Sequence, residues 1–173
     1  MADNDAAPRE FDPAGLLETL YGHGVRYVVI GGIAAGVQGA VWATTDLDIC
    51  YARTPDDLQR LAAALAGLEA RPIGLDPGMR VKLDARALLR ADIWTLDTRL
   101  GRLDIMREAV IGMDYAYLVA RARTIRGERS DYLVASLDDL VAMKRAAARP
   151  KDVAHIELLQ IARDELRRRA GSD

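Results

Sequence analysis

The sequence predicts a single α+β (mixed α/β) domain, in which a small mixed sheet is flanked by helices and further helices follow at the C-terminal end. A β-branched run ends in a pair of glycines and is followed by a run that alternates acidic and apolar residues, which indicates two strands joined by a turn or short helix. Two later apolar runs flank a polar turn, as in an antiparallel hairpin. The last third of the chain carries amphipathic segments typical of helices. With 173 residues, the chain has the length of one ordinary domain, residues 1–173.

The first part of the chain is predicted to alternate helices and strands. A helix begins after Asp12, a residue type favoured at the N-cap, with Pro13 in its first turn. Residues 25–30 form a short run with β-branched and aromatic side chains that glycines bound, so we expect a buried strand. Residues 33–38 are expected to form a short helix, and residues 46–51 a strand with one acidic face.

From residue 54 onward, helices are predicted to dominate. Thr54 and Pro55 are typical of a helix start, and four leucines at helical spacing give the helix one apolar stripe. Gly101 lies in the turn of the expected hairpin. Capping residues and apolar periodicity predict the other elements. These are a loop at 72–78, hairpin strands at 93–96 and 102–106, a strand at 132–134, and helices at 84–89, 115–122, 137–147 and 151–169.

The composition excludes several classes of protein. A net charge of −2 argues against a protein whose whole surface binds nucleic acid. The single cysteine, Cys50, excludes an intrachain disulfide and a zinc site built from several cysteines. No apolar run approaches the roughly 20 residues of a membrane-spanning helix, and the acidic N-terminus lacks the features of a secretory signal. We therefore expect a cytoplasmic protein without a membrane partner, with residues 1–11 as a flexible tail.

The most informative segment joins a glycine pair to two carboxylates. Gly31 and Gly32 end the first strand, and Asp46 and Asp48 lie two positions apart on the next one. Such side chains point to the same face of a strand, with α-carbons roughly 7 Å apart. Two carboxylates there are unfavourable unless a cation compensates them, and Mg²⁺ prefers carboxylate and phosphate oxygens. The glycines let a phosphate approach backbone N–H groups near a helix start. The segment thus predicts a divalent-metal site for a phosphate ligand.

This arrangement resembles the nucleotidyltransferase superfamily of the DNA polymerase β type. Its signature is a strand that ends in Gly-Gly or Gly-Ser, a helix, an Asp-x-Asp strand and a third carboxylate on a later strand. Asp104, which apolar residues flank on a predicted strand, matches the third carboxylate. The branch that the chain resembles comprises small bacterial proteins similar to abortive-infection toxins and minimal nucleotidyltransferases. The resemblance covers roughly residues 25–51, 100–106 and 133–160.

The resemblance implies transfer of a nucleoside monophosphate from a nucleoside triphosphate to an acceptor hydroxyl, with Mg²⁺ or Mn²⁺ as the cofactor. The acceptor it implies is an RNA or tRNA end, a partner protein, or a small molecule such as an antibiotic, in a toxin–antitoxin, phage-defence or other role. The implied catalytic and metal-binding residues are Asp46, Asp48 and Asp104. The implied nucleotide-binding residues are Gly31, Gly32, Lys144 and Lys151.

Alternatives to this interpretation remain open at the level of sequence. Relatives often have His-Gly where this chain has Gln38 and a glycine, and arginine where it has Trp42. Loss of that arginine favours a second hypothesis, a binding module or antitoxin with weak or absent turnover that acts through a protein partner. Lys144 and Lys151 can also lie on the polar faces of helices, the usual environment of lysine. A dinucleotide-binding fingerprint at Gly31 fits less well, because it needs one acid about 20 residues further on, and here two come earlier.

Overall fold

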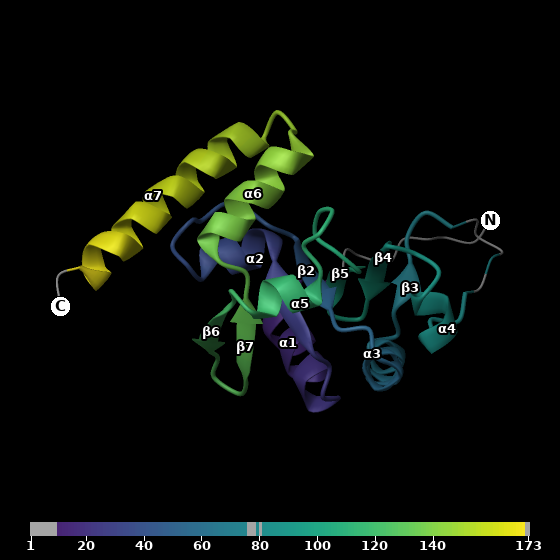
Figure 1. The fold of residues 1–173 in the computed structure, drawn as a ribbon. Helices are drawn as coiled ribbons and strands as arrows, with labels where there is room; N and C mark the ends of the chain where they lie inside the picture. Colours follow the sequence, from purple (N-terminus) through teal and green to yellow (C-terminus); the bar gives the residue numbers. More distant parts are fainter. Residues whose placement is uncertain (1–9, 76–78, 80, 172–173) are drawn as a thin grey trace.

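A computed structural model describes residues 10–75, 79 and 81–171, and these form a seven-stranded mixed sheet with helices on both faces (Figure 1). The strand order is β3-β4-β5-β2-β1-β7-β6. Neighbours β2 and β5 run parallel, as do β1 and β7, and the other neighbouring pairs are antiparallel. The strands are β1 (Tyr27–Ile30), β2 (Asp46–Tyr51), β3 (Arg71–Pro72), β4 (Ile93–Thr98), β5 (Gly101–Met106), β6 (Arg123–Arg126) and β7 (Asp131–Val134).

Helices cover the sheet from two sides. In Figure 1, α1 and α3 lie below the sheet, and α6 and α7 form a helical hairpin above it. The helices of the described chain are α1 (Pro13–Gly22), α2 (Gly31–Gly36), α3 (Pro55–Gly67), α4 (Ala85–Leu88), α5 (Tyr115–Val119), α6 (Leu137–Ala147) and α7 (Asp152–Ala170). None of these described helices is long and apolar enough to cross a membrane.

The central strands separate an apolar face from an acidic one. In β2, Leu47 and Ile49 are fully buried, whereas Asp46 and Asp48 are half-buried. Strand β5 repeats this alternation, with Asp104 half-buried between buried apolar neighbours. Because β2 and β5 pair in register, their apolar side chains join one core and their carboxylates share the opposite face.

The predicted fold class is confirmed, and most elements lie where the sequence places them. Helix α6 has the predicted bounds, Leu137–Ala147. The hydroxyl of Ser136 fixes its start by accepting a hydrogen bond from the Asp139 N–H. Helix α3 begins with a capping box formed by Thr54 and Asp57, as expected for that start.

Three segments differ most clearly from the prediction. Helix α2 begins at Gly31 rather than at residue 33, so the glycine pair is the first turn of the helix. Residues 123–126 form the edge strand β6, which we did not predict because an arginine-rich run without apolar alternation gives no strand signal. Pro72, predicted to begin the loop at 72–78, instead lies in the short edge strand β3. Residues 76–78 of that loop lie outside the described residues.

The described chain begins packed against the sheet. Phe11 contacts the core beside Gly101, and the Asp12 N–H donates a hydrogen bond to the Leu100 carbonyl at 3.0 Å. The predicted tail spans residues 1–11, and residues 1–9 of it lie outside the described part of the chain.

Candidate functional site

Three carboxylates meet on the acidic face of β2 and β5. Asp48 is the direct pairing partner of Asp104, and Asp46 lies two positions before Asp48 on the same face. One carboxylate oxygen from each residue lies within 4.8 Å of the other two, and all three side chains are half-buried. The structure therefore brings the three predicted carboxylates together as a set of oxygen donors of the kind that Mg²⁺ and Mn²⁺ prefer.

The electrostatics of Asp48 also fit a cation. Burial raises the pKa of the Asp48 carboxyl to about 7, and the charges of Asp46 and Asp104 add to this, while Lys144 and Arg102 oppose it. A carboxyl group with such a pKa is only partly ionised at neutral pH, because burial and the two neighbouring carboxylates disfavour its negative charge. A bound divalent ion would favour the ionised form.

Arg102 lies within the carboxylate cluster. It is the pairing partner of Asp46 in the β2–β5 register and precedes Asp104 by two residues. Its Nε donates a hydrogen bond to Asp104 Oδ1 at 3.3 Å and lies 4.0 Å from Asp46 Oδ2. The hydrogen bond to Asp104 raises the pKa of the guanidinium, a group that is charged at neutral pH in any case. The sequence analysis gave Arg102 no role, although its spacing from Asp104 was the signal that could have found it.

The glycine pair lets the chain pack closely around the carboxylates. Gly31 has a φ of +67°, in the left-handed region that favours glycine, and a Cβ atom there would overlap the Asp48 carboxylate. A Cβ atom on Gly32 would lie 2.7 Å from the Cβ of Thr44. The Thr44 hydroxyl in turn donates to Asp46 Oδ1 at 3.0 Å. Packing alone therefore accounts for both glycines, which also line the cleft described below.

A basic wall faces the carboxylates from α6 and the start of α7. Lys144, only 14% exposed, pairs with the buried Asp152 at 3.2 Å from Nζ to Oδ1. Arg149 donates to the other oxygen of that carboxylate from its Nε at 2.9 Å. Burial would raise the pKa of Asp152, but the hydrogen bonds from Arg149 and Lys144 outweigh it, and the pKa lies below its ordinary value. Lys151 is exposed at the N-cap of α7. Asp152 thus fixes two cations at the wall.

Trp42 joins this wall through an aromatic stack. Its ring lies 4.2 Å from the ring of His155, centroid to centroid, at an interplanar angle of 9°. Lys144 Nζ lies 5.3 Å from the Trp42 ring centroid, within cation–π range. Burial, together with the charge of Lys144, lowers the pKa of His155. At the position where relatives carry arginine, this chain has an aromatic platform that holds the loop after α2 against α7.

These groups line one cleft of about 680 Å³, a volume in the usual range for a small-molecule site. The carboxylates form one side and the basic residues the other. The cleft brings together every site residue that the sequence predicted, namely Gly31, Gly32, Asp46, Asp48, Asp104, Lys144 and Lys151. It adds cleft residues to which the sequence analysis assigned no role in the site, namely Trp42, Thr44, Arg102, Arg149 and His155.

Gln38, the other departure from the family pattern, lies outside this cleft. It is buried, and its Nε2 donates to the carbonyl oxygens of Ala34 at 2.9 Å and Ala135 at 2.8 Å. These bonds hold α2 against the segment that follows β7. The substitution at residue 38 is thus accommodated in the packing and does not change the groups that face the carboxylates.

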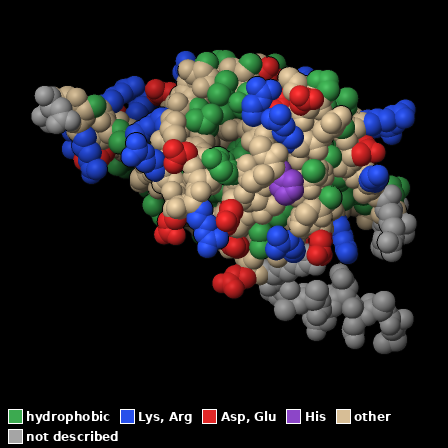
Figure 2. Space-filling model, turned by 90° about the horizontal axis from the view of Figure 1, so that it is seen from below, with side chains coloured by type: hydrophobic (Ala, Val, Ile, Leu, Met, Phe, Trp, Pro, Cys, Tyr) green, Lys and Arg blue, Asp and Glu red, His purple; other side chains and the backbone are tan. Residues whose placement is uncertain are grey.

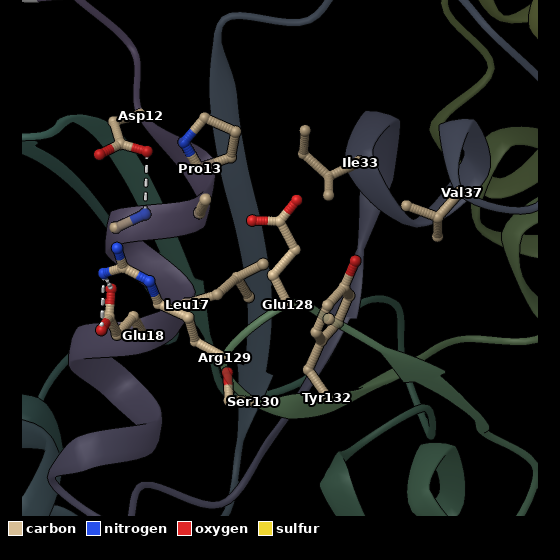
Figure 3. Close-up of a pocket in the computed structure, with 13 residues that line it drawn as sticks. Asp12, Pro13, Leu17, Glu18, Ile33, Val37, Glu128, Arg129, Ser130 and Tyr132 are labelled. Atoms are coloured by element: carbon tan, nitrogen blue, oxygen red, sulfur yellow. Dashed lines mark hydrogen bonds and ion pairs between the residues drawn. The ribbon is translucent and has the colours of Figure 1, made fainter.

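A second cavity, of about 520 Å³, lies between α1, α2 and the β6–β7 turn (Figure 3). Its walls are largely apolar, with Leu17 from α1, Ile33 from α2 and Val37 directly after α2. Glu18 and Arg129 form an ion pair at its edge, at 2.8 Å. None of the three clustered carboxylates lines this cavity, so we assign the candidate chemistry to the acidic cleft.

No protein-family model and no curated protein matches this chain in sequence. Its structure is similar to that of the lincosamide antibiotic adenylyltransferase LnuA in its lincomycin-bound form, with a TM-score of 0.60 and 13% sequence identity over 87% of this chain and 98% of that chain. The chain has the nucleotidyltransferase fold. The solution structure of the antibiotic-resistance factor ANT(2'')-Ia is also similar, with a TM-score of 0.48 and 15% identity over 91% of this chain and 92% of that chain. The similarity to LnuA confirms the fold that the resemblance implied, and at this identity it concerns the fold alone.

Proposed function

We propose that this protein is a metal-dependent nucleotidyltransferase that transfers a nucleoside monophosphate from a nucleoside triphosphate to an acceptor hydroxyl. The observation that carries this proposal is the position of the three carboxylates opposite a basic wall in one cleft of a nucleotidyltransferase fold. The carboxylates suit a divalent cation, and the wall suits the negative charge of a polyphosphate.

The proposed metal ligands are Asp46, Asp48 and Asp104, with Mg²⁺ or Mn²⁺ as the ion. A divalent ion supplies charge neutralisation of the phosphates and makes the acceptor hydroxyl easier to deprotonate. Thr44 orients Asp46 by hydrogen bonding to its carboxylate. The contact of Asp48 with Gly31 limits the positions that the Asp48 carboxylate can take.

The remaining residues act on the nucleotide and the acceptor. The backbone at Gly31 and Gly32, which lines the cleft beside the carboxylates, seats the phosphates. Asp104 accepts the proton of the acceptor hydroxyl as its oxygen forms a bond to the α-phosphorus. The bond between the α-phosphorus and the bridging oxygen breaks, and its electron pair leaves with pyrophosphate. Lys144 and Lys151 neutralise the charge that develops on this leaving group.

For the acceptor we propose a small hydroxylated molecule with an apolar body. Ile93, Met106 and Ala109 line the cleft near Asp104, so an apolar surface adjoins the proposed site of attack. LnuA, which has a similar fold, is described as an adenylyltransferase of lincosamide antibiotics. Figure 2 shows the molecule from below, away from α6 and α7, and acidic and basic side chains are interspersed over that face.

Transfer of a labelled α-phosphate tests this proposal. The protein would be incubated with Mg²⁺ or Mn²⁺ and each of the four nucleoside triphosphates, against separate pools of hydroxylated small molecules, total RNA and total protein. We expect label in the small-molecule pool, and none with Asp48→Asn. Label in RNA or protein would mean that the acceptor is a macromolecule, as in a toxin-like role. No transfer to any pool would contradict the enzymatic proposal.

The second hypothesis, a binding module without turnover, rests on Trp42 in place of the family's arginine. It predicts that the protein binds a metal–nucleotide complex and releases no pyrophosphate with any acceptor. The result that would support it is transfer activity in a Trp42→Arg variant when the wild-type protein shows none.

A further inference from the structure

Arg102 pairs with two of the three carboxylates that a metal ion would need. Its Nε contacts Asp104 at 3.3 Å and lies 4.0 Å from Asp46, while the ligand oxygens of the three carboxylates lie within 4.8 Å of one another. A guanidinium and a divalent ion repel each other at such distances. Metal binding to the cluster therefore requires Arg102 to move or leaves both cations in an unfavourable arrangement.

The other cations of the cleft do not share this conflict. Lys144 and Arg149 pair with Asp152, which lies in the basic wall and is not one of the clustered carboxylates. They can keep their partner when a metal binds. Arg102 is different because its ion pairs are with Asp46 and Asp104.

Arg102 is also free to move towards the cleft. Its side chain is 47% exposed and lines the cleft directly, so the guanidinium can swing without disturbing the core. Guanidinium groups form paired, charge-assisted hydrogen bonds with phosphate oxygens. A polyphosphate in this cleft would offer such oxygens as new partners when Arg102 moves away from Asp46 and Asp104.

We propose that Arg102 is a counter-ion built into the metal site, which neutralises the carboxylate cluster in the absence of metal and moves to the phosphates of the nucleotide when metal and nucleotide bind together. This inference rests on the metal site of the proposed function. It makes Arg102 a positioning residue that couples the two ligands. Metal alone binds weakly because it must displace the guanidinium, whereas nucleotide provides the displaced group with a new partner. By linkage, the nucleotide then binds more tightly in the presence of metal by the same factor.

The test compares wild type with Arg102→Gln, which keeps a polar side chain and removes the charge. Binding of Mn²⁺ is measured by titration calorimetry, first without nucleotide and then with a non-hydrolysable nucleoside triphosphate analogue. Arg107→Gln is the matched control, because Arg107 is 48% exposed and pairs with two carboxylates, Asp92 and Glu108, outside this cleft. Arg102→Lys keeps the charge but loses the paired hydrogen bonds of the guanidinium, so if the glutamine variant folds poorly it tests the nucleotide arm, where the improvement of Mn²⁺ binding by the analogue should again be smaller than in wild type.

Without nucleotide, we expect Arg102→Gln to bind Mn²⁺ at least about tenfold more tightly than wild type and the Arg107→Gln control. The factor by which the analogue improves Mn²⁺ binding should be smaller in Arg102→Gln than in wild type. In a metal-free buffer the variant should melt at a lower temperature than wild type, and Mn²⁺ alone should stabilise it more.

Two results would overturn the proposal, and they differ in what else they affect. If wild type and Arg102→Gln bind Mn²⁺ with equal affinity, Arg102 is not a counter-ion of the metal site, and the proposed function stands. If neither protein binds Mn²⁺ with or without nucleotide, the metal site itself is absent, and both proposals are wrong.

Discussion

The carboxylate of Asp48 on β2 fills the space that a Cβ atom at residue 31 would occupy. The glycine at the start of α2 and the second acid of the Asp-x-Asp strand are therefore parts of one packed unit. Strand β1 leads into Gly31 and pairs with β2 so that Ile30 lies opposite Asp48. This pairing brings the two halves of the sequence motif into contact.

Gly31→Ala tests that contact. The new methyl group would meet the Asp48 carboxylate, and alanine would also be strained at a φ of +67°. We expect the free energy of unfolding to fall by about 1–3 kcal/mol, measured by chemical denaturation. Gly36→Ala, in the same helix, is the control. A Cβ atom there meets nothing within 4 Å, so this substitution should be neutral or slightly stabilising.

Asp48→Asn should remove metal-dependent nucleotide binding and leave the fold intact. Because the pKa of Asp48 lies at about 7, above its ordinary value of 3.8, ionising this group opposes folding. That penalty is present above about pH 7 and disappears near pH 4. In metal-free buffer at pH 8, the variant should be more stable than wild type by about 1–2 kcal/mol, and at pH 4 the difference should vanish.

The control for this measurement is Asp131→Asn, which changes an exposed carboxylate on β7. If Asp48→Asn unfolds at pH 8 and wild type binds no metal, Asp48 is a structural residue and the assignment of the cluster is wrong.

Trp42→Ala should raise the pKa of His155. The stacked indole contributes to the burial that lowers this pKa, so its removal exposes the imidazole to water. The measurement is a titration of the histidine ring protons by nuclear magnetic resonance. The sequence has two histidines, and His23 at the end of α1 provides an internal reference signal. Trp42→Phe keeps an aromatic face and should change the pKa less. An unchanged pKa in Trp42→Ala would show that the stack does not shield His155.

Asp57→Asn should destabilise the protein in a pH-dependent way. Hydrogen bonds from Arg26 hold the pKa of Asp57 at about 2, below its ordinary value of 3.8. The stabilisation is therefore complete above about pH 5 and is lost as the pH falls from about 4 to 2. We expect a loss of about 1–2 kcal/mol at pH 7 that disappears near pH 2. Asp56→Asn, on an exposed neighbour in the same turn, should show no such dependence. An equal loss at every pH would mean that the carboxylate charge is not involved.

Local signals predicted most of the fold. The start of α1 at Asp12 and Pro13, and that of α6 at Ser136, follow from capping chemistry that acts over a few residues. The edge strand β6 could not be predicted in this way. Its pairing with β7 supplies the backbone hydrogen bonds that stabilise it, and its own residues carry no strand pattern.

The candidate site was predictable where a motif is continuous. Gly31, Asp46 and Asp48 lie within 18 residues of sequence, and strand periodicity gives their common face. The neighbours of Trp42 were not predictable, because His155 reaches it only through the packing of α7 against the loop after α2. Long-range contacts of this kind depend on helix placement, which single-residue patterns do not encode.

Asp104 provides the most direct test of the central claim, that the acidic cleft performs nucleotidyl transfer. Asp104→Asn keeps the size of the side chain and removes the charge that would accept the proton of the acceptor, while Asp46 and Asp48 remain to hold the metal–nucleotide complex. The measurement is the rate of transfer of a labelled α-phosphate, beside the affinity for a non-hydrolysable analogue with Mg²⁺. We predict that transfer falls by orders of magnitude while the affinity changes by less than about tenfold. Unaltered transfer by Asp104→Asn would contradict the proposed mechanism.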